Sequence, residues 1–114
     1  PGLHINGQQT LGENIADVSG LTIAHAAYVK ALHGQPAPIL DGLTGDQRFF
    51  LAYAQAWRQK TREPTLRQQI IADGHAPGAF RAQTVRNLDA WYQAFPSEPG
   101  DKLHLAPENR VRIW

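Results

Sequence analysis

Two acidic side chains lie one helical turn apart in a stretch with helical periodicity. Glu13 and Asp17 are separated by roughly 40° around a helix axis and therefore project from the same side of it. Carboxylates placed in this way can ligate a metal ion or transfer protons. If a neighbouring element covers them, they need a cationic partner or a metal, because an unpaired buried charge is very costly.

Helix capping is the competing explanation for Glu13. The run Thr10-Leu-Gly-Glu13 fits a capping box, in which the glutamate reaches back to the amide of the N-cap residue. Acidic side chains near a helix start are also stabilised by the positive end of the helix dipole. From the residues alone, capping and solvent exposure are the commoner roles, and a role in metal binding or acid–base chemistry stays open.

His75 and Arg81 bracket a turn that contains proline and glycine. The intervening run Ala76-Pro-Gly-Ala-Phe80 can hold the imidazole and the guanidinium toward one point. An imidazole N–H beside a guanidinium is a suitable clamp for a carbonyl oxygen or an oxyanion. A surface loop that leads into a helix is the simpler alternative, since histidines are common in loops.

The other histidines do not complete a metal site within this chain. They are scattered, no two of them stand at positions i and i+4, and the run H-E-x-x-H is absent: His4, His25, His33 and His104. His25 falls on the apolar face of a predicted helix, which indicates a place in the core or an interface. The chain also has no cysteine, which excludes disulfides, zinc knuckles and thiol catalysis.

Four helices are expected to position these side chains, which predicts an all-α fold. Periodic apolar side chains that include Leu11, Ile15 and Val18 predict the first helix over residues 10–32. Thr44 and Gln47 fit a capping box at the start of the second. The other expected elements are helices over residues 44–59, 64–74 and 87–95, a loop over 75–81, and an extended tail over 96–114 that could end in a short strand over 111–114.

Small residues continue the side of the first helix that carries the two carboxylates. The stripe consists of Gly20, Ala24, Ala27 and Ala31. Because none of these side chains is bulky, another backbone can approach closely there, and the carboxylates would then lie beneath a neighbouring element. An isolated chain with this stripe uncovered is expected to form a homodimer or to exchange elements with a second copy.

Length and composition narrow the remaining function classes. The chain has 114 residues, a net charge of +1 and 18% charged residues, which predicts one globular domain. No run of lysine and arginine indicates a nucleic-acid partner, and no apolar stretch is long enough to predict a membrane segment. The sequence begins with Pro1 and contains no methionine, so we expect a piece of a longer protein.

Three segments carry a family resemblance. Gly12-Glu-Asn-Ile-Ala-Asp17 is similar to a G-E-N-x-A-D motif, His75-Ala-Pro-Gly-Ala-Phe-Arg81 to an H-x-P-x-x-[FY]-R loop, and Pro107–Trp114 to a C-terminal end that finishes on tryptophan. Together they resemble the neprilysin and endothelin-converting-enzyme family of zinc metallopeptidases. Gln47–Trp57 resembles the family's helix between the first two motifs. The absence of cysteines is similar to the family's bacterial branch.

The resemblance implies a role for each of the four side chains. Glu13 would be the third protein ligand of a catalytic zinc, beside two histidines of an H-E-x-x-H helix. Asp17 would be a proton donor or the carboxylate partner of a zinc-bound histidine. His75 would stabilise the oxyanion of the tetrahedral intermediate, and Arg81 would bind a substrate backbone carbonyl beyond the scissile bond.

The same resemblance implies that this chain is only part of an active site. Residues 1–114 would be the helical C-terminal portion of a gluzincin-type catalytic domain, with zinc as cofactor, short peptides as substrates and an extracytoplasmic location. The zinc histidines and the general base would come from the remainder of the parent chain, which carries H-E-x-x-H, so this chain alone is expected to be inactive. A non-catalytic helical interaction module that kept the fold without the chemistry is the alternative.

Overall fold

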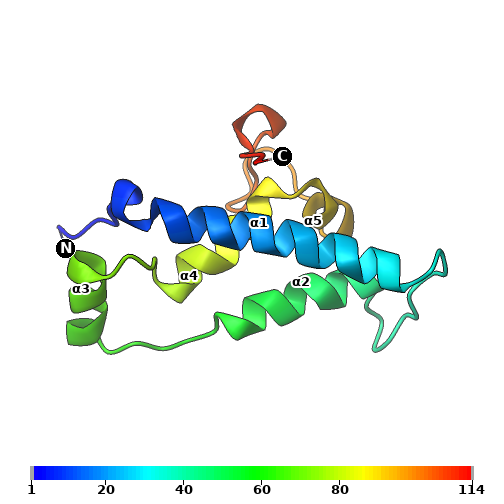
Figure 1. Cartoon of the computed structure of the whole chain (residues 1–114), viewed down its shortest axis with the longest axis horizontal. Coiled ribbons are helices and arrows are strands. Elements are labelled where there is room, and N and C mark those ends of the chain that lie inside the picture. The colour runs from blue at the N-terminus through cyan, green and yellow to red at the C-terminus, as the bar shows by residue number, and fades with distance from the viewer. Residues whose placement is uncertain (1, 114) are drawn as a thin grey trace.

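The computed structural model describes residues 2–113, and within them every regular element is helical. The prediction of an all-α fold is therefore confirmed. Helix α1 spans the long axis of the molecule, and α2 runs back along it before the chain crosses to α3 and returns through α4 (Figure 1). The elements are α1 (Gly7–Ala31), α2 (Gly45–Ala56), α3 (Glu63–Ala72), α4 (Gly78–Arg81) and α5 (Asp89–Ala94), with 3₁₀ helices η1 (Ala82–Asn87) and η2 (Pro107–Asn109).

The start of α1 differs from the prediction in a way that matters for Glu13. Asn6 is the N-cap, and its side-chain oxygen accepts hydrogen bonds from the backbone N–H groups of Gln8 at 3.0 Å and Gln9 at 3.2 Å. Thr10 lies inside the helix, where its hydroxyl donates to the Asn6 carbonyl. The capping-box interpretation of Thr10 and Glu13 is therefore wrong, because an asparagine one turn earlier already satisfies the free amides of the helix start.

The other boundaries are mostly close to the predicted ones. The capping box of Thr44 and Gln47 is present at the start of α2. The predicted loop over residues 75–81 is wrong in its second half, because Gly78 begins the short helix α4 and the chain continues directly into η1. Since η1 occupies residues 82–87, α5 starts later than predicted. No strand forms over residues 111–113, and residue 114 lies outside the described part of the chain.

The core lies where α1, α2, η1 and α5 meet. Phe50 is 2% exposed, and it packs with buried side chains from the other three elements and from Leu88 between η1 and α5: Val18, Leu21, Val85, Leu88, Trp91 and Ala94. His25 lies at the edge of this core, as predicted, with its ring 5.4 Å from that of Phe50 and its Nε2 3.0 Å from Asp46. These contacts hold α1 and α2 together.

The apolar face of α1 is longer than the core that covers it. Leu11 and Ile15, which were predicted to belong to that face, are 54% and 38% exposed. The radius of gyration is 15.7 Å, against about 13 Å for a compact chain of about 100 residues. The described structure is thus an open arrangement with much uncovered apolar surface. None of its helices has both the length and the apolarity that crossing a membrane requires.

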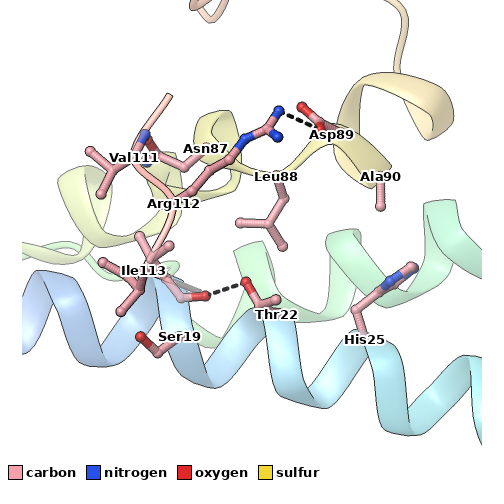
Figure 2. Close-up of a pocket in the computed structure, with 11 residues that line it drawn as sticks. Ser19, Thr22, His25, Asn87, Leu88, Asp89, Ala90, Val111, Arg112 and Ile113 are labelled. Atoms are coloured by element: carbon pink, nitrogen blue, oxygen red, sulfur yellow. Dashed lines mark hydrogen bonds and ion pairs between the residues drawn. The ribbon is translucent and has the colours of Figure 1, made fainter. Parts of the chain in front are cut away.

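Ion pairs anchor the C-terminal tail to the start of α5. Asp89 accepts from Arg110 at 2.7 Å and from Arg112 at 2.8 Å. The Arg110 guanidinium also lies 3.6 Å from the centre of the Tyr92 ring. The tail thereby forms one wall of a cavity of about 240 Å³ above α1, with Ile113 opposite Leu88 (Figure 2).

Candidate active site

The fold brings together the four side chains that the sequence singled out. Glu13 and Asp17 project from the N-terminal half of α1, His75 precedes α4, and Arg81 ends it. Figure 1 shows α4 lying beside this part of α1. The two predicted groups, a carboxylate pair and an imidazole–guanidinium pair, are therefore parts of one cluster.

Arg81 and Asp17 form a bidentate ion pair. The Arg81 Nε donates to Asp17 Oδ2 and its Nη2 donates to Asp17 Oδ1, each at 2.7 Å. The side chains are only 13% and 8% exposed. The hydrogen bonding of Arg81 to the Asp17 carboxylate is the main reason that the pKa of Arg81 is raised above its ordinary value. A planar fork matched to a carboxylate is the strongest form of such a pair and fixes the orientation of both groups.

Glu13 lies between the His75 ring and the Arg81 guanidinium and keeps an accessible edge. Its Oε2 is 3.2 Å from His75 Nε2 and 3.5 Å from Arg81 Nη2. The Glu13 side chain is 42% exposed, in contrast to the buried Asp17. Since Asn6 caps the helix, Glu13 has no capping role. Its carboxylate faces the same point as the imidazole and the guanidinium.

Asp73 fixes the orientation of the His75 ring, and the sequence analysis missed it. Its Oδ1 accepts from the His75 backbone N–H at 2.9 Å and lies 2.7 Å from the ring Nδ1. The backbone hydrogen bond from His75 is the first cause of a lowered pKa of Asp73, followed by the ring hydrogen bond. Nε2 is consequently the nitrogen that faces Glu13. The signal in the sequence was an aspartate two residues before the histidine, a spacing typical of an Asx turn.

Helix α2 contributes two aromatic side chains that the sequence analysis placed only on an apolar face. The Arg81 guanidinium lies 4.0 Å from the centre of the Trp57 ring, within the range of a cation–π contact. One turn earlier, the Tyr53 hydroxyl reaches the main-chain carbonyl of Arg81 at 3.2 Å. No local pattern could have identified this role, because the contacts join residues far apart in the chain.

The described residues do not form a complete metal site. Among residues 2–113, no group of three or more His, Asp or Glu side chains is arranged to hold a metal ion. Catalytic zinc is usually held by three protein ligands. A carboxylate with an exposed edge, such as that of Glu13, has the chemistry of one such ligand. Beside it, the imidazole and the guanidinium can polarise a carbonyl group or stabilise an oxyanion.

Comparisons with known proteins agree along almost the whole chain. A family model described as peptidase family M13 matches residues 2–111. Neprilysin-3 of Drosophila melanogaster is 36% identical over 118 residues, covering 99% of this chain and 15% of that protein. Neutral endopeptidase of Lactobacillus helveticus is 37% identical over 111 residues, covering 96% of this chain and 16% of that protein.

A solved structure is similar over the full length of the chain. The zinc metalloprotease Zmp1 of Mycobacterium tuberculosis, in complex with an inhibitor, aligns with a TM-score of 0.96 and 50% identity. The alignment covers 100% of this chain and 18% of Zmp1. The sequence thus spans less than one fifth of the length of each of these relatives.

Proposed function

This chain belongs to peptidase family M13, and from that membership we propose that it is the C-terminal part of the catalytic domain of a zinc metallopeptidase. The parent protein would hydrolyse peptide bonds in short peptides. The observation that carries the proposal is the cluster of Glu13, Asp17, His75 and Arg81, in which side chains more than sixty residues apart in sequence meet at one point. A helix cap and a surface loop would not require that meeting.

Glu13 is proposed as the third zinc ligand. Its exposed carboxylate edge supports this role, and two histidines from the remainder of the parent chain would complete the site. When bound, zinc lowers the pKa of its water so that a nucleophile is available near neutral pH. The general base, the glutamate of H-E-x-x-H, would also come from the remainder of the parent. This chain alone is therefore expected to have no peptidase activity.

Asp17 is proposed as the partner of a zinc-bound histidine rather than as a proton donor. Both of its oxygens already accept hydrogen bonds from Arg81, which supports a role as an acceptor. A carboxylate offers about four lone-pair sites, so Asp17 can accept a further N–H from an imidazole. Such a bond orients the imidazole and strengthens it as a ligand.

His75 is proposed to stabilise the oxyanion that forms on the attacked carbonyl. Its two ring nitrogens face carboxylates, Asp73 at 2.7 Å and Glu13 at 3.2 Å. Asp73 holds the Nδ1 side. Nε2 is then directed toward Glu13 and the space beside it, where an N–H donor would stabilise a developing negative charge.

Arg81 is proposed to bind a substrate backbone carbonyl beyond the scissile bond. Of its five N–H groups, those on Nε and Nη2 serve Asp17 and Glu13. Nη1 makes no hydrogen bond within residues 2–113, so two N–H groups on a fixed guanidinium can donate to a ligand. Asp17 and Trp57 hold that guanidinium in place before any substrate arrives.

The remaining proposals concern the parent protein. Its partners would be peptide substrates and the rest of its own chain, and the small net charge gives no support to a nucleic-acid partner. An extracytoplasmic location is supported by relatives such as human Membrane metallo-endopeptidase-like 1, which is 39% identical over 116 residues. The isolated chain is proposed to form homodimers, because the small-residue stripe of α1 is exposed.

A ligand substitution in the full parent protein tests the proposal. Glu13→Gln should lower both the zinc content, measured by elemental analysis, and the peptidase rate by at least about tenfold. Glu63→Gln is the matched control, because within residues 2–113 Glu63 pairs only with Arg67 on the surface of α3. Unchanged zinc content and turnover in Glu13→Gln would refute the proposal. A parent without H-E-x-x-H would instead support the interaction module.

A further inference from the structure

Arg81 is held by α2 at its main chain as well as at its side chain, and we infer that Tyr53 is a positioning residue for Arg81. Tyr53 acts through the Arg81 carbonyl and the neighbouring Thr84 hydroxyl, without touching the guanidinium. The inference rests on the proposed function, in which Arg81 binds a substrate carbonyl. It adds a residue whose chemistry lies outside the four motif side chains.

The contacts form a triangle of two hydroxyls and one carbonyl. The Thr84 hydroxyl donates to the Arg81 carbonyl at 2.8 Å, the Tyr53 hydroxyl lies 2.9 Å from Thr84 Oγ1, and it lies 3.2 Å from the same carbonyl. The two hydroxyl groups have one proton each, so only two of these three contacts can have a proton of their own. The two shortest contacts are satisfied together when Tyr53 donates to Thr84 and Thr84 donates to Arg81. In such a chain each hydrogen bond polarises the next and strengthens it.

The position of Arg81 in the chain explains why this support matters. Arg81 is the last residue of α4, a helix of four residues, and the chain passes there into the 3₁₀ helix η1. So short a helix has little stability of its own, and 3₁₀ geometry gives poorer backbone hydrogen bonds. The direction in which the Arg81 side chain leaves the backbone therefore depends on contacts from outside α4 and η1.

Helix α2 is capped and packed into the core, so such contacts can act from it. Its start is fixed by the capping box of Thr44 and Gln47, and Phe50 anchors it in the core. Tyr53 and Trp57 stand one turn apart on the same face, with ring centres 6.2 Å apart. Tyr53 thus fixes the main chain of Arg81, and Trp57 supports its guanidinium at 4.0 Å.

The surroundings of the tyrosine agree with a donor role. Thr84 is buried, with 9% of its surface exposed, so water does not compete strongly for its hydroxyl. Burial is the largest cause of a raised pKa of Tyr53. The phenol therefore keeps its proton, and with it the ability to donate, throughout the neutral range.

The test compares two tyrosine substitutions in the full parent enzyme. The probes are a short internally quenched fluorogenic peptide and an analogue in which a methylene replaces the carbonyl proposed to meet Arg81. Tyr53→Phe should raise KM for the peptide by about three- to tenfold, with kcat within about twofold, and should leave KM for the analogue unchanged. Tyr28→Phe is the matched control, because the Tyr28 hydroxyl makes no hydrogen bond within residues 2–113.

Two further variants separate failure of this inference from failure of the proposed function. Arg81→Met should raise KM for the peptide. It should also abolish the difference in KM between the peptide and the methylene analogue. If it leaves that difference intact, the proposed role of Arg81 is wrong. If Arg81→Met abolishes the difference in KM between the two probes but Tyr53→Phe behaves like Tyr28→Phe, the positioning role of Tyr53 is overturned.

A merely structural role of Tyr53 has a distinct outcome. In that case Tyr53→Phe would lower kcat/KM equally for both probes, and the inference would fall. Thr84→Val covers the possibility that Tyr53→Phe fails to fold, because it breaks the same hydrogen-bond chain from the other side. It should shift KM in the same direction, and the double variant should add little to the larger single effect, since both act through one carbonyl.

Discussion

The molecule contains the same three-part arrangement twice, an arginine set between an aspartate and an aromatic ring. At the candidate site Arg81 pairs with Asp17 and stacks on Trp57, and in the tail Arg110 pairs with Asp89 and stacks on Tyr92. The arginines are similarly buried, at 13% and 9% exposure. What differs is the aspartate, which is 8% exposed in Asp17 and 52% exposed in Asp89.

This difference distinguishes the candidate active site from a contact that only anchors the C-terminal tail. Asp17 gives both oxygens to one guanidinium, and that guanidinium lies next to a second carboxylate and an imidazole. Asp89 divides its oxygens between two tail arginines, and Arg110 also donates to the Leu105 carbonyl. Identical side-chain chemistry therefore does not identify a functional arginine. What distinguishes Arg81 is its further ionisable neighbours, Glu13 and His75.

Deleting the two aspartates should give the largest contrast. Asp17→Ala leaves Arg81 without its buried partner and is expected to lower the free energy of unfolding by about 3 kcal/mol or more. Asp89→Ala removes an exposed carboxylate and should lower it by about 1 kcal/mol or less. Urea denaturation of the chain of residues 1–114 measures both. Equal losses would mean that the two arrangements are energetically alike, and the comparison would fail.

Replacing the two arginines should sharpen the functional side of the contrast. In the full parent enzyme, Arg81→Met is expected to raise KM for a short peptide by about 10- to 100-fold, because a charged donor to the substrate carbonyl is lost. Arg110→Met should leave KM within about twofold, since the hydrogen bonds of Arg110 join the tail to itself and to Asp89 of α5. Steady-state kinetics of both variants on one peptide decide the matter. A similar rise in KM for both would place the tail in the substrate site.

The Asp73–His75 contact should matter for turnover to a smaller extent. Asp73→Asn keeps the shape but weakens the acceptor that orients the imidazole, and turnover is expected to fall by about tenfold. Asp101→Asn is the control, because Asp101 accepts a backbone N–H from Glu98 in the tail, away from the cluster. Loss of turnover in both variants would point to a general structural effect.

The pH dependence of this contact follows from the lowered pKa of Asp73. Because the folded pKa lies below the ordinary value of 3.8, the contact stabilises the folded chain fully above that value. The stabilisation is lost only as the pH falls through the lower, folded value. The stability difference between the native chain and Asp73→Asn should therefore be constant from neutral pH down to about pH 5 and shrink at lower pH. Denaturation curves across that range measure it.

The sequence predicted the helices better than it predicted the contacts of the four candidate side chains. Apolar spacing and the pair Thr44 and Gln47 were sufficient to place α2, because both signals are local. The start of α1 was missed because Asn6 and Thr10 are both good N-caps, and propensity alone does not choose between them. The partners of Arg81 come from helices α1 and α2, so no pattern within residues 75–81 could have specified them.

The uncovered apolar surface has a similar explanation. Periodicity identified an apolar face on α1 that includes Leu11, but it did not say which element would cover each position. In the structure, the core covers Val18 and Leu21 and leaves Leu11 exposed. A residue pattern therefore predicts which side of a helix is buried, and tertiary contacts decide how much of its length.

The smallest expected effect concerns the two sides of α1. The apolar side packs against the core, and the opposite side carries the exposed small-residue stripe. A side chain added at Gly20 would meet nothing within 4 Å, and the alanines of the stripe are exposed. Sedimentation of residues 1–114 should show a concentration-dependent homodimer, which Ala27→Glu in the stripe should weaken and Gln68→Glu on α3 should not. A clean monomer at high concentration would contradict this prediction. Backbones that approach closely need small residues along the whole contact, so one charged side chain in the stripe should be enough to keep two helices apart.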